Sequence, residues 1–269
     1  MNNYAQYLLK TQLHMEEMWL PLGSPPPLRC NIFLSPNIRA CETLVLLIQG
    51  TGDVRAGIWS RSLASQVGLS QGSMIPYLRA IEREGWGCVC FNPNEIHIGG
   101  EPITPIQSDE RHVQYVWTHV VKGTILRENP GIKHLLIISH SRGGTLTTKL
   151  LEGNSRDILP LLRGVAMLDS AHKDWPSRTL PPALFQTLQR FWTGPLVCNW
   201  KRNATAPVDT PLPAGNKGCT CLSAGTPEHV RTVNVPFDSA FHFLRQCLDR
   251  ARRSGPPPGV RPPPPPHKR

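Results

Sequence analysis

Apolar residues in this chain fall in short continuous runs, and these runs alternate with segments whose apolar residues recur at helical spacing. The runs expected to form strands are residues 29–35, 43–50, 86–93, 134–139, 164–170 and 218–226. The segments expected to form helices are residues 4–20, 58–68, 73–84, 108–128, 143–152, 183–192 and 237–251. Strands that are apolar on both faces and alternate with helices are typical of a parallel sheet buried between helical layers. The pattern therefore predicts an α/β fold, with a mostly parallel sheet and helices on both faces.

Prolines mark the borders of this pattern. Residues 172–216 are rich in proline and tryptophan, and we expect irregular structure there apart from one helix at 183–192. The last stretch, SGPPPGVRPPPPPHKR, cannot build a core and is typical of polyproline II. We predict one domain over residues 1–252 and a disordered proline-rich tail over residues 253–269. Within the tail, residues 263–268 fit the ligand pattern of SH3-type domains.

Polar residues follow the predicted strands at the points where the strands end. In parallel sheets the functional groups gather beyond the carboxyl ends of the strands. In chain order these ends present a glycine-rich loop (Gly50, Thr51, Gly52), then Ser141, Asp169 and His229. The order Ser, Asp, His is that of the α/β-hydrolases. Small residues stand two before and two after the serine, as the tight turn under a nucleophile requires. The sequence therefore predicts an α/β-hydrolase-like fold.

These residues could carry acyl transfer. Ser141 would be the nucleophile, His229 its general base and Asp169 the group that orients the imidazole. Two backbone donors would stabilise the oxyanion: the N–H of Arg142, at the start of the following helix, and one N–H of the Gly50–Gly52 loop.

Structural roles are the alternative for the same residues. Ser141 could cap the helix that begins near Gly143, and Asp169 could accept backbone hydrogen bonds at its turn. His140 and His172 compete with His229 for a proton-transfer role. His229 is favoured by its place between the last strand and the last helix.

Composition limits the partners. The chain has 269 residues and a formal net charge of +10. The charge is spread along the chain, and no helix has one basic face, so nucleic acid is expected to be contacted only indirectly. No apolar run approaches the roughly 20 residues of a membrane span, so no membrane partner is expected. The N-terminus lacks a basic start followed by an apolar core, and a secreted protein is not indicated.

The eight cysteines include two Cys-x-Cys pairs on predicted strands, Cys88/Cys90 and Cys219/Cys221. Alternation along a strand places both thiols of a pair on the same face. Two such pairs could form a four-thiolate zinc site, but small buried core residues are the favoured interpretation. We expect no metal or other cofactor, and scattered thiols in a chain of this length favour a reducing compartment.

Several stretches resemble one known family. They are LLIQGTGDVRAGIWSRSL (46–63), SMIPYLRAIEREGWGCVCFNPNE (73–95), IISHSRGGTLTTKLL (137–151), VAMLDSAH (165–172) and SAGTPEHVRT (223–232). They are similar to the Arb-two domain of the Argonaute-binding protein and of the animal cotranscriptional regulators, over about residues 5–250. The resemblance implies an α/β-hydrolase-like fold with a serine at the elbow. It also implies nuclear or cytoplasmic work with Argonaute, chromatin or splicing partners, and in some members retention in the endoplasmic reticulum.

The sequence departs from that family at the end of the first strong strand and at the residue after the serine. Gln49-Gly50 stands where His-Gly is usual, and Arg142 stands where an aromatic residue is more usual. A guanidinium there is expected to place a permanent charge at the mouth of the pocket, where it either selects an acidic substrate or blocks the site.

Two functions remain open at this stage. The favoured one is a nuclear binding protein, associated with cotranscriptional regulation, RNA silencing or splicing, that reuses a hydrolase scaffold and is catalytically impaired. The alternative is a serine hydrolase of the esterase, thioesterase or amidase type that uses Ser141, Asp169 and His229.

Overall fold

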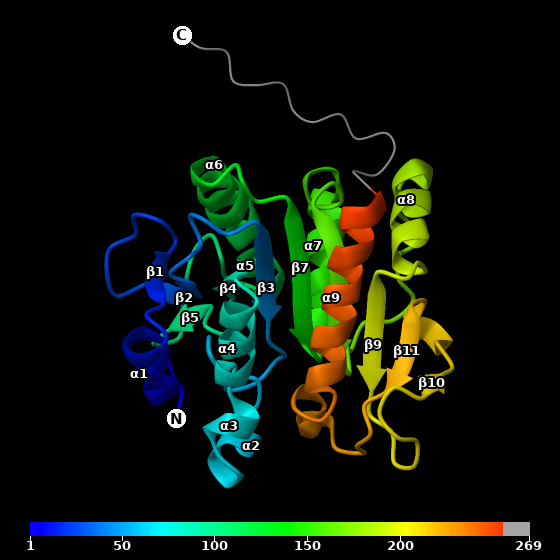
Figure 1. Ribbon diagram of the computed structural model, residues 1–269. Helices are drawn as coiled ribbons and strands as arrows, with labels where there is room; N and C mark the ends of the chain where they lie inside the picture. The colour runs from blue at the N-terminus through cyan, green and yellow to red at the C-terminus, as the bar shows by residue number, and fades with distance from the viewer. Residues whose placement is uncertain (255–269) are drawn as a thin grey trace.

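The strands form one large sheet and a small hairpin, seen in a computed structural model that describes residues 1–254 (Figure 1). In the large sheet the strands run in the order β1 (Glu16–Leu20), β2 (Cys30–Leu34), β4 (Gly87–Cys90), β3 (Thr43–Ile48), β7 (His134–His140), β8 (Leu162–Leu168), β9 (Val197–Lys201), β11 (Thr220–Ser223) and β10 (Pro211–Leu212). The hairpin pairs β5 (His97–Ile98) with β6 (Glu101–Pro102). The six strands from β4 to β11 are parallel, and antiparallel strands border them on both sides.

Helices precede, connect and follow the strands. They are α1 (Asn2–Gln12), α2 (Arg61–Gln66), α3 (Leu69–Gly72), α4 (Ile75–Arg83), α5 (Asp109–Tyr115), the π-helical η1 (Val116–Ile125), α6 (Leu126–Glu128), α7 (Arg142–Ile158), α8 (Pro182–Trp192), the short 3-10 turns η2 (Gly215–Lys217) and η3 (His229–Val233), and α9 (Phe237–Ser254). Ser108 caps α5, since its hydroxyl accepts a hydrogen bond from the Arg111 N–H at 3.1 Å.

The sheet separates two hydrophobic cores. Side chains of α5, η1, α7 and α8 fill the core on one face, and those of α1, α4 and α9 fill the core on the other. Figure 1 shows α4 and α9 together in front of the sheet, with α5 and α7 behind it. In β3 alternate residues serve the two cores: Leu46 points to one and Leu47 to the other. This two-sided burial explains why the central strands are apolar throughout, and the predicted α/β-hydrolase-like architecture is confirmed.

The parallel direction of the central strands brings their carboxyl ends to one edge of the sheet. That edge is the lower one in Figure 1, where the arrowheads of β3, β7 and β9 end. The loops after β3, β7, β8 and β11 therefore converge there, and these loops carry the candidate catalytic residues.

The N-terminal helix is shorter than the sequence indicates. We expected one helix over residues 4–20, but α1 ends at Gln12, and β1 follows and pairs with β2. His14 has a positive φ of 50°, which breaks the helix. The helix buries Ala5 and Leu9, one turn apart, while Tyr7 faces solvent. Because β1 occupies the border, the strand predicted at 29–35 is the second strand of the sheet.

A strand also lies in the stretch that we expected to be irregular. Residues Val197–Lys201 form β9, which pairs with β8 on one side and with β11 on the other. The strand is short and lies between proline-rich segments, so its five residues carry little periodic signal. The adjoining β10 was missed for the same reason.

The two Cys-x-Cys pairs lie on distant strands. Cys88 and Cys90 belong to β4, while Cys219 precedes β11 and Cys221 lies in it. Five strand-to-strand steps of about 4.8 Å, roughly 24 Å in total, separate β4 from β11. A four-thiolate site built from both pairs is therefore ruled out. All eight cysteines are buried as free thiols.

The C-terminal helix α9 continues to Ser254, slightly past the predicted domain end at 252. The proline-rich tail, with its predicted disorder and SH3-type ligand, lies outside the described residues, and both remain predictions. Within residues 1–254 no helix combines the length and the apolar character that a membrane crossing requires.

Candidate active site

Ser141 occupies a sharp turn between β7 and α7. Its φ of 54° and ψ of −121° fall in a region that favours glycine, so the turn holds the residue in a strained conformation. Three backbone hydrogen bonds fix it: the Ser141 N–H donates to the Leu168 carbonyl at 3.0 Å, and the Ser141 carbonyl accepts from the N–H groups of Ala171 at 2.9 Å and Gly144 at 3.1 Å. The Ser141 hydroxyl makes no capping bond to α7, so the structural alternative of an N-cap is wrong.

Three glycines make room for this turn. A Cβ on Gly143 would lie 2.1 Å from the Ile48 carbonyl oxygen, and one on Gly50 would lie 2.8 Å from the Ser141 Cβ. A Cβ on Gly144 would lie 1.8 Å from the Ser170 Oγ. Side chains at these positions would push the loops after β3, β7 and β8 apart. The requirement for a small residue after the serine therefore has a direct steric cause, as the sequence indicated.

Asp169 and His229 are joined by a short hydrogen bond. The His229 Nδ1 lies 2.6 Å from the Asp169 Oδ2, across 60 residues of sequence. Asp169 follows β8 with a positive φ of 46°, and its N–H donates to the Trp200 carbonyl, which aims the carboxylate at His229. Burial acts to raise the pKa of Asp169, but the His229 hydrogen bond and charge and the Arg202 backbone N–H and charge outweigh it. The pKa of Asp169 is consequently lowered, and the carboxylate is ionised near neutral pH.

The two competing histidines have other partners. His140 is fully buried and stacks on His229 with ring centroids 4.7 Å apart; burial first, and then the His229 charge, lower its pKa to about 3. His172 bonds the Ser170 hydroxyl at 2.6 Å, and burial lowers its pKa to about 4. Neither contacts a carboxylate within the described part of the chain, so both are held neutral. His229 is the histidine that the fold aligns with an acid.

Ser141, Asp169 and His229 line one cavity of about 490 Å³ at the carboxyl edge of the sheet. Between the Ser141 Oγ and the His229 ring the described atoms form no hydrogen bond, so two of the three members are linked directly and the third lines the same cavity. Catalytic hydrogen bonds are often long without substrate and tighten in the Michaelis complex.

The predicted oxyanion donors surround the serine unevenly. Gly50 is buried directly against the Ser141 side chain, and the Asn94 amide fixes it by donating to the Gly50 carbonyl at 2.8 Å. Thr51 and Gly52 follow on the exposed side of the loop. The N–H of Arg142, the first residue of α7, has no acceptor within the helix. The Gly50 and Arg142 backbones therefore flank Ser141, while Thr51 and Gly52 extend the loop toward solvent.

The Arg142 side chain does not lie at the mouth of the cavity, contrary to expectation. Its Nε donates to the Asp109 Oδ2 at 2.9 Å, and its Nη2 lies 3.2 Å from the Glu110 Oε1. Both acids belong to the first turn of α5, and these hydrogen bonds and charges raise the pKa of Arg142 further. The Arg142 side chain ties α7 to α5, and the guanidinium neither lines nor blocks the cavity.

Four cationic residues line the cavity instead: Lys173, Lys201, Arg202 and Lys217. Sequence reasoning missed them because they stand in the stretch that we expected to be irregular or at its border. The one sequence signal was their density: Lys201 ends the stretch VCNWK, which forms β9, and Arg202 follows it directly.

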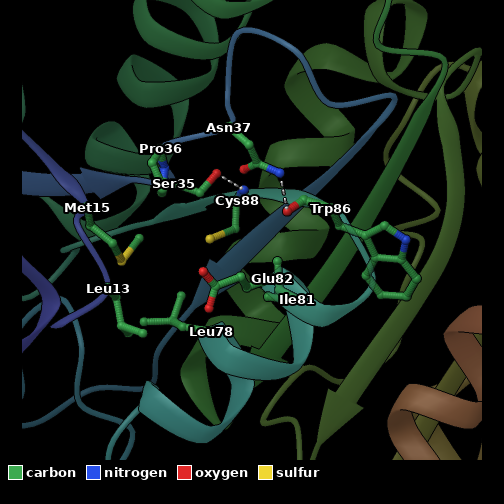
Figure 2. A pocket seen from close by; sticks show the side chains of 10 residues that line it. All are labelled: Leu13, Met15, Ser35, Pro36, Asn37, Leu78, Ile81, Glu82, Trp86 and Cys88. Atoms are coloured by element: carbon green, nitrogen blue, oxygen red, sulfur yellow. Dashed lines mark hydrogen bonds between the residues drawn. The ribbon is translucent and has the colours of Figure 1, made fainter.

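A second cavity, of about 280 Å³, lies away from these residues (Figure 2). It opens beside α4 and is lined mainly by apolar side chains such as Leu13, Leu78 and Trp86. Figure 2 shows that the Ser35 hydroxyl, which could have faced a ligand, accepts the Cys88 N–H instead, at 2.8 Å. None of the predicted catalytic residues reaches this cavity.

The fold and the strand-end site define an α/β-hydrolase-like protein. Comparison with solved structures agrees: a histone deacetylase from Saccharomyces cerevisiae superposes with a TM-score of 0.58 at 16% identity, over 91% of this chain and 95% of that one. An esterase of Pyrococcus furiosus superposes with a TM-score of 0.52 at 12% identity, over 90% and 93%. At such identities the likeness establishes the fold alone.

The family is shown by sequence. The profile of the Arb2 domain matches residues 2–184, and the chain belongs to that family. A cotranscriptional regulator ARB2A homolog of Xenopus tropicalis is 27% identical, over 90% of this chain and 67% of its own length. The chain is thus a relative of cotranscriptional regulators built on an α/β-hydrolase-like fold, as the quoted stretches indicated.

Proposed function

We propose that this chain is a serine hydrolase that cleaves an ester, thioester or amide. The observation that carries the proposal is the 2.6 Å bond between His229 and Asp169, in the same cavity as a serine held at φ 54°. A triad hydrolase requires this bond between acid and imidazole and a serine presented on a sharp turn beside them. The geometry thus favours the function that the sequence ranked second.

The chemistry follows from these positions. The Ser141 Oγ attacks the acyl carbon while its proton passes to the His229 Nε2, and ionised Asp169 stabilises the imidazolium through Nδ1. The backbone N–H groups of Arg142 and the Gly50–Gly52 loop stabilise the oxyanion. His229 then protonates the leaving group, and water hydrolyses the acyl-serine by the reverse sequence of proton transfers.

A fluorophosphonate probe tests this proposal. We expect labelling of the folded wild-type protein, loss of labelling in Ser141→Ala, and a strong decrease in His229→Gln. Ser139→Ala is the matched control, because Ser139 is two residues away on β7 and its hydroxyl is buried without a hydrogen-bond partner in the described structure. Labelling that persists in Ser141→Ala, or a folded wild-type protein that stays unlabelled, would overturn the proposal.

We also propose a nuclear role through protein partners, which membership in the Arb2 family and the name of its relative support. The partners implied are Argonaute, chromatin or splicing factors, with nucleic acid contacted only through them. A binding assay with purified Argonaute tests the first of these partners directly. We expect capture by wild-type protein and equally by Ser141→Ala, because a docking surface does not need the nucleophile. Capture that depends on Ser141 would tie binding to catalysis and contradict a separate role.

A further inference from the structure

The cavity around Ser141 has a strong excess of positive charge. Lys173, Lys201, Arg202 and Lys217 line it, against one carboxylate, that of Asp169. Asp169 is already engaged by His229, and the Arg202 Nε approaches the same carboxylate at 3.4 Å. Asp169 therefore cannot neutralise the remaining cations.

The ammonium groups of Lys173 and Lys201 make no ion pair or hydrogen bond with the described residues. Some cations elsewhere are matched with acids, as Lys122 is with Asp157 and Arg245 with Glu84. The cavity is distinguished by four cations that line one volume with a single carboxylate among them.

Lys217 has a different task. Its Nζ donates to the carbonyls of Ser170 and His172, at 2.7 and 2.6 Å, and so braces the loop that carries Asp169. Burial first lowers the pKa of Lys217, and the charges of Lys201 and Lys173 lower it further while Asp169 opposes them. The cations are thus close enough to act on one another, and they gather around one small volume.

From this placement we propose that the site selects an acyl substrate with a negative charge beside the scissile bond, and that Lys173 and Lys201 supply the selectivity. The proposal rests on the proposed hydrolase function. A cleft lined by charges of one sign concentrates ligands of the opposite sign and favours their binding. A carboxylate or phosphate on the substrate would replace the missing counter-ion.

Paired chromogenic esters test the inference. The 4-nitrophenyl monoester of adipate ends in a carboxylate, 4-nitrophenyl hexanoate ends in a methyl group at the same place, and 3-carboxy-4-nitrophenyl hexanoate carries the charge on the leaving group. We expect kcat/KM for one of the anionic esters to exceed that for neutral hexanoate by about tenfold or more at low salt. Comparison of the two anionic esters shows whether the site recognises a negative charge on the acyl group or on the leaving group. The preference should shrink as the ionic strength rises to about 0.5 M.

Substitution identifies the residues responsible. Lys173→Gln and Lys201→Gln should each reduce the preference severalfold and leave hydrolysis of neutral hexanoate nearly unchanged. Lys133→Gln is the matched control, since Lys133 stands just before the amino end of β7 whereas Ser141 follows its carboxyl end. Eight residue steps of about 3.3 Å separate it from Ser141, about 26 Å in total, well beyond the Debye length of about 8 Å.

The outcomes separate the two proposals. Turnover that depends on Ser141 but shows no preference for charge would leave the hydrolase standing and overturn this inference. If no ester is cleaved, binding of the adipate monoester is measured by calorimetry. Binding that weakens in the Lys173 and Lys201 variants supports an anion pocket while the hydrolase proposal fails, and absence of binding overturns both.

Discussion

The strain at Ser141 can be measured by replacing it with glycine. Its φ of 54° and ψ of −121° cost of order 1–3 kcal/mol for a residue with a Cβ, and glycine escapes this cost. Glycine in turn loses about 0.5–1 kcal/mol more backbone entropy on folding. We therefore expect Ser141→Gly to be more stable than Ser141→Ala by about 0.5–2 kcal/mol. Alanine is the right reference because it keeps the Cβ that lies against Gly50, and so keeps the strain, but lacks the hydroxyl.

Thermal unfolding followed by circular dichroism provides the measurement. At about 2–4 °C per kcal/mol for a domain of this size, the glycine variant should melt about 1–8 °C above the alanine variant. Urea titration should place the same difference in the midpoint, with an unchanged slope. Equal stability of the two variants, or a lower stability of the glycine variant, would refute the claim that the fold holds a strained elbow here.

Three further predictions follow from the site and its surroundings. Asp169→Asn should lower kcat/KM for ester hydrolysis by about 10³–10⁴ through misalignment of His229, without loss of the fold. Its stability deficit should be present above about pH 4 and vanish as the pH falls through the lowered pKa of Asp169, which urea titration at several pH values checks. Gln49→Met should raise the free energy of unfolding by about 1 kcal/mol, because both amide atoms of Gln49 are buried without hydrogen-bond partners in the described structure; a lower melting temperature would contradict this. Finally, burial lowers the pKa values of His112, His140 and His172 to about 3, 3 and 4, so the folded chain excludes protons that the unfolded chain takes up. The free energy of unfolding should therefore fall as the pH falls from about 6.5 to about 4, by about 1.4 kcal/mol per pH unit for each of these histidines. A free energy of unfolding that stays constant over that range would refute this prediction.

The central sheet could be predicted because its strands are buried on both faces. β3 is apolar at every position after Thr43, and β7 has four consecutive apolar residues at 135–138. Such short runs, bounded by polar and glycine residues, are typical of buried parallel strands. The same reasoning located Ser141, Asp169 and His229, since parallel strands must deliver their carboxyl ends to one edge. The 2.6 Å bond between Asp169 and His229 joins residues that sequence order alone had paired.

The borders of the sheet could not be predicted in the same way. β1 is half exposed, and its residues read equally well as the end of an amphipathic helix until the turn at His14 separates them. β9 has only five residues and lies between proline-rich segments, so its hydrophobic pattern does not indicate a strand. Its hydrogen bonds to β8 and β11 stabilise it instead. Short strands are specified by their neighbours, which lie far away in the sequence.

The charge of the site shows the same dependence on distant residues. Arg142 adjoins Ser141 in the chain, yet its guanidinium turns toward α5, where Asp109 and Glu110 offer two carboxylates. The cations that do line the cavity, among them Lys173 and Lys201, come from 30 or more residues further along, because the sheet brings the ends of β8 and β9 beside the end of β7. A residue next to Ser141 in the sequence can therefore direct its side chain away from the cavity. The order of the strands in the sheet determines which side chains line the cavity together. A study of substrate charge in this protein should therefore substitute the lysines after β8 and at the end of β9, and use Arg142 as a probe of how α5 and α7 are joined.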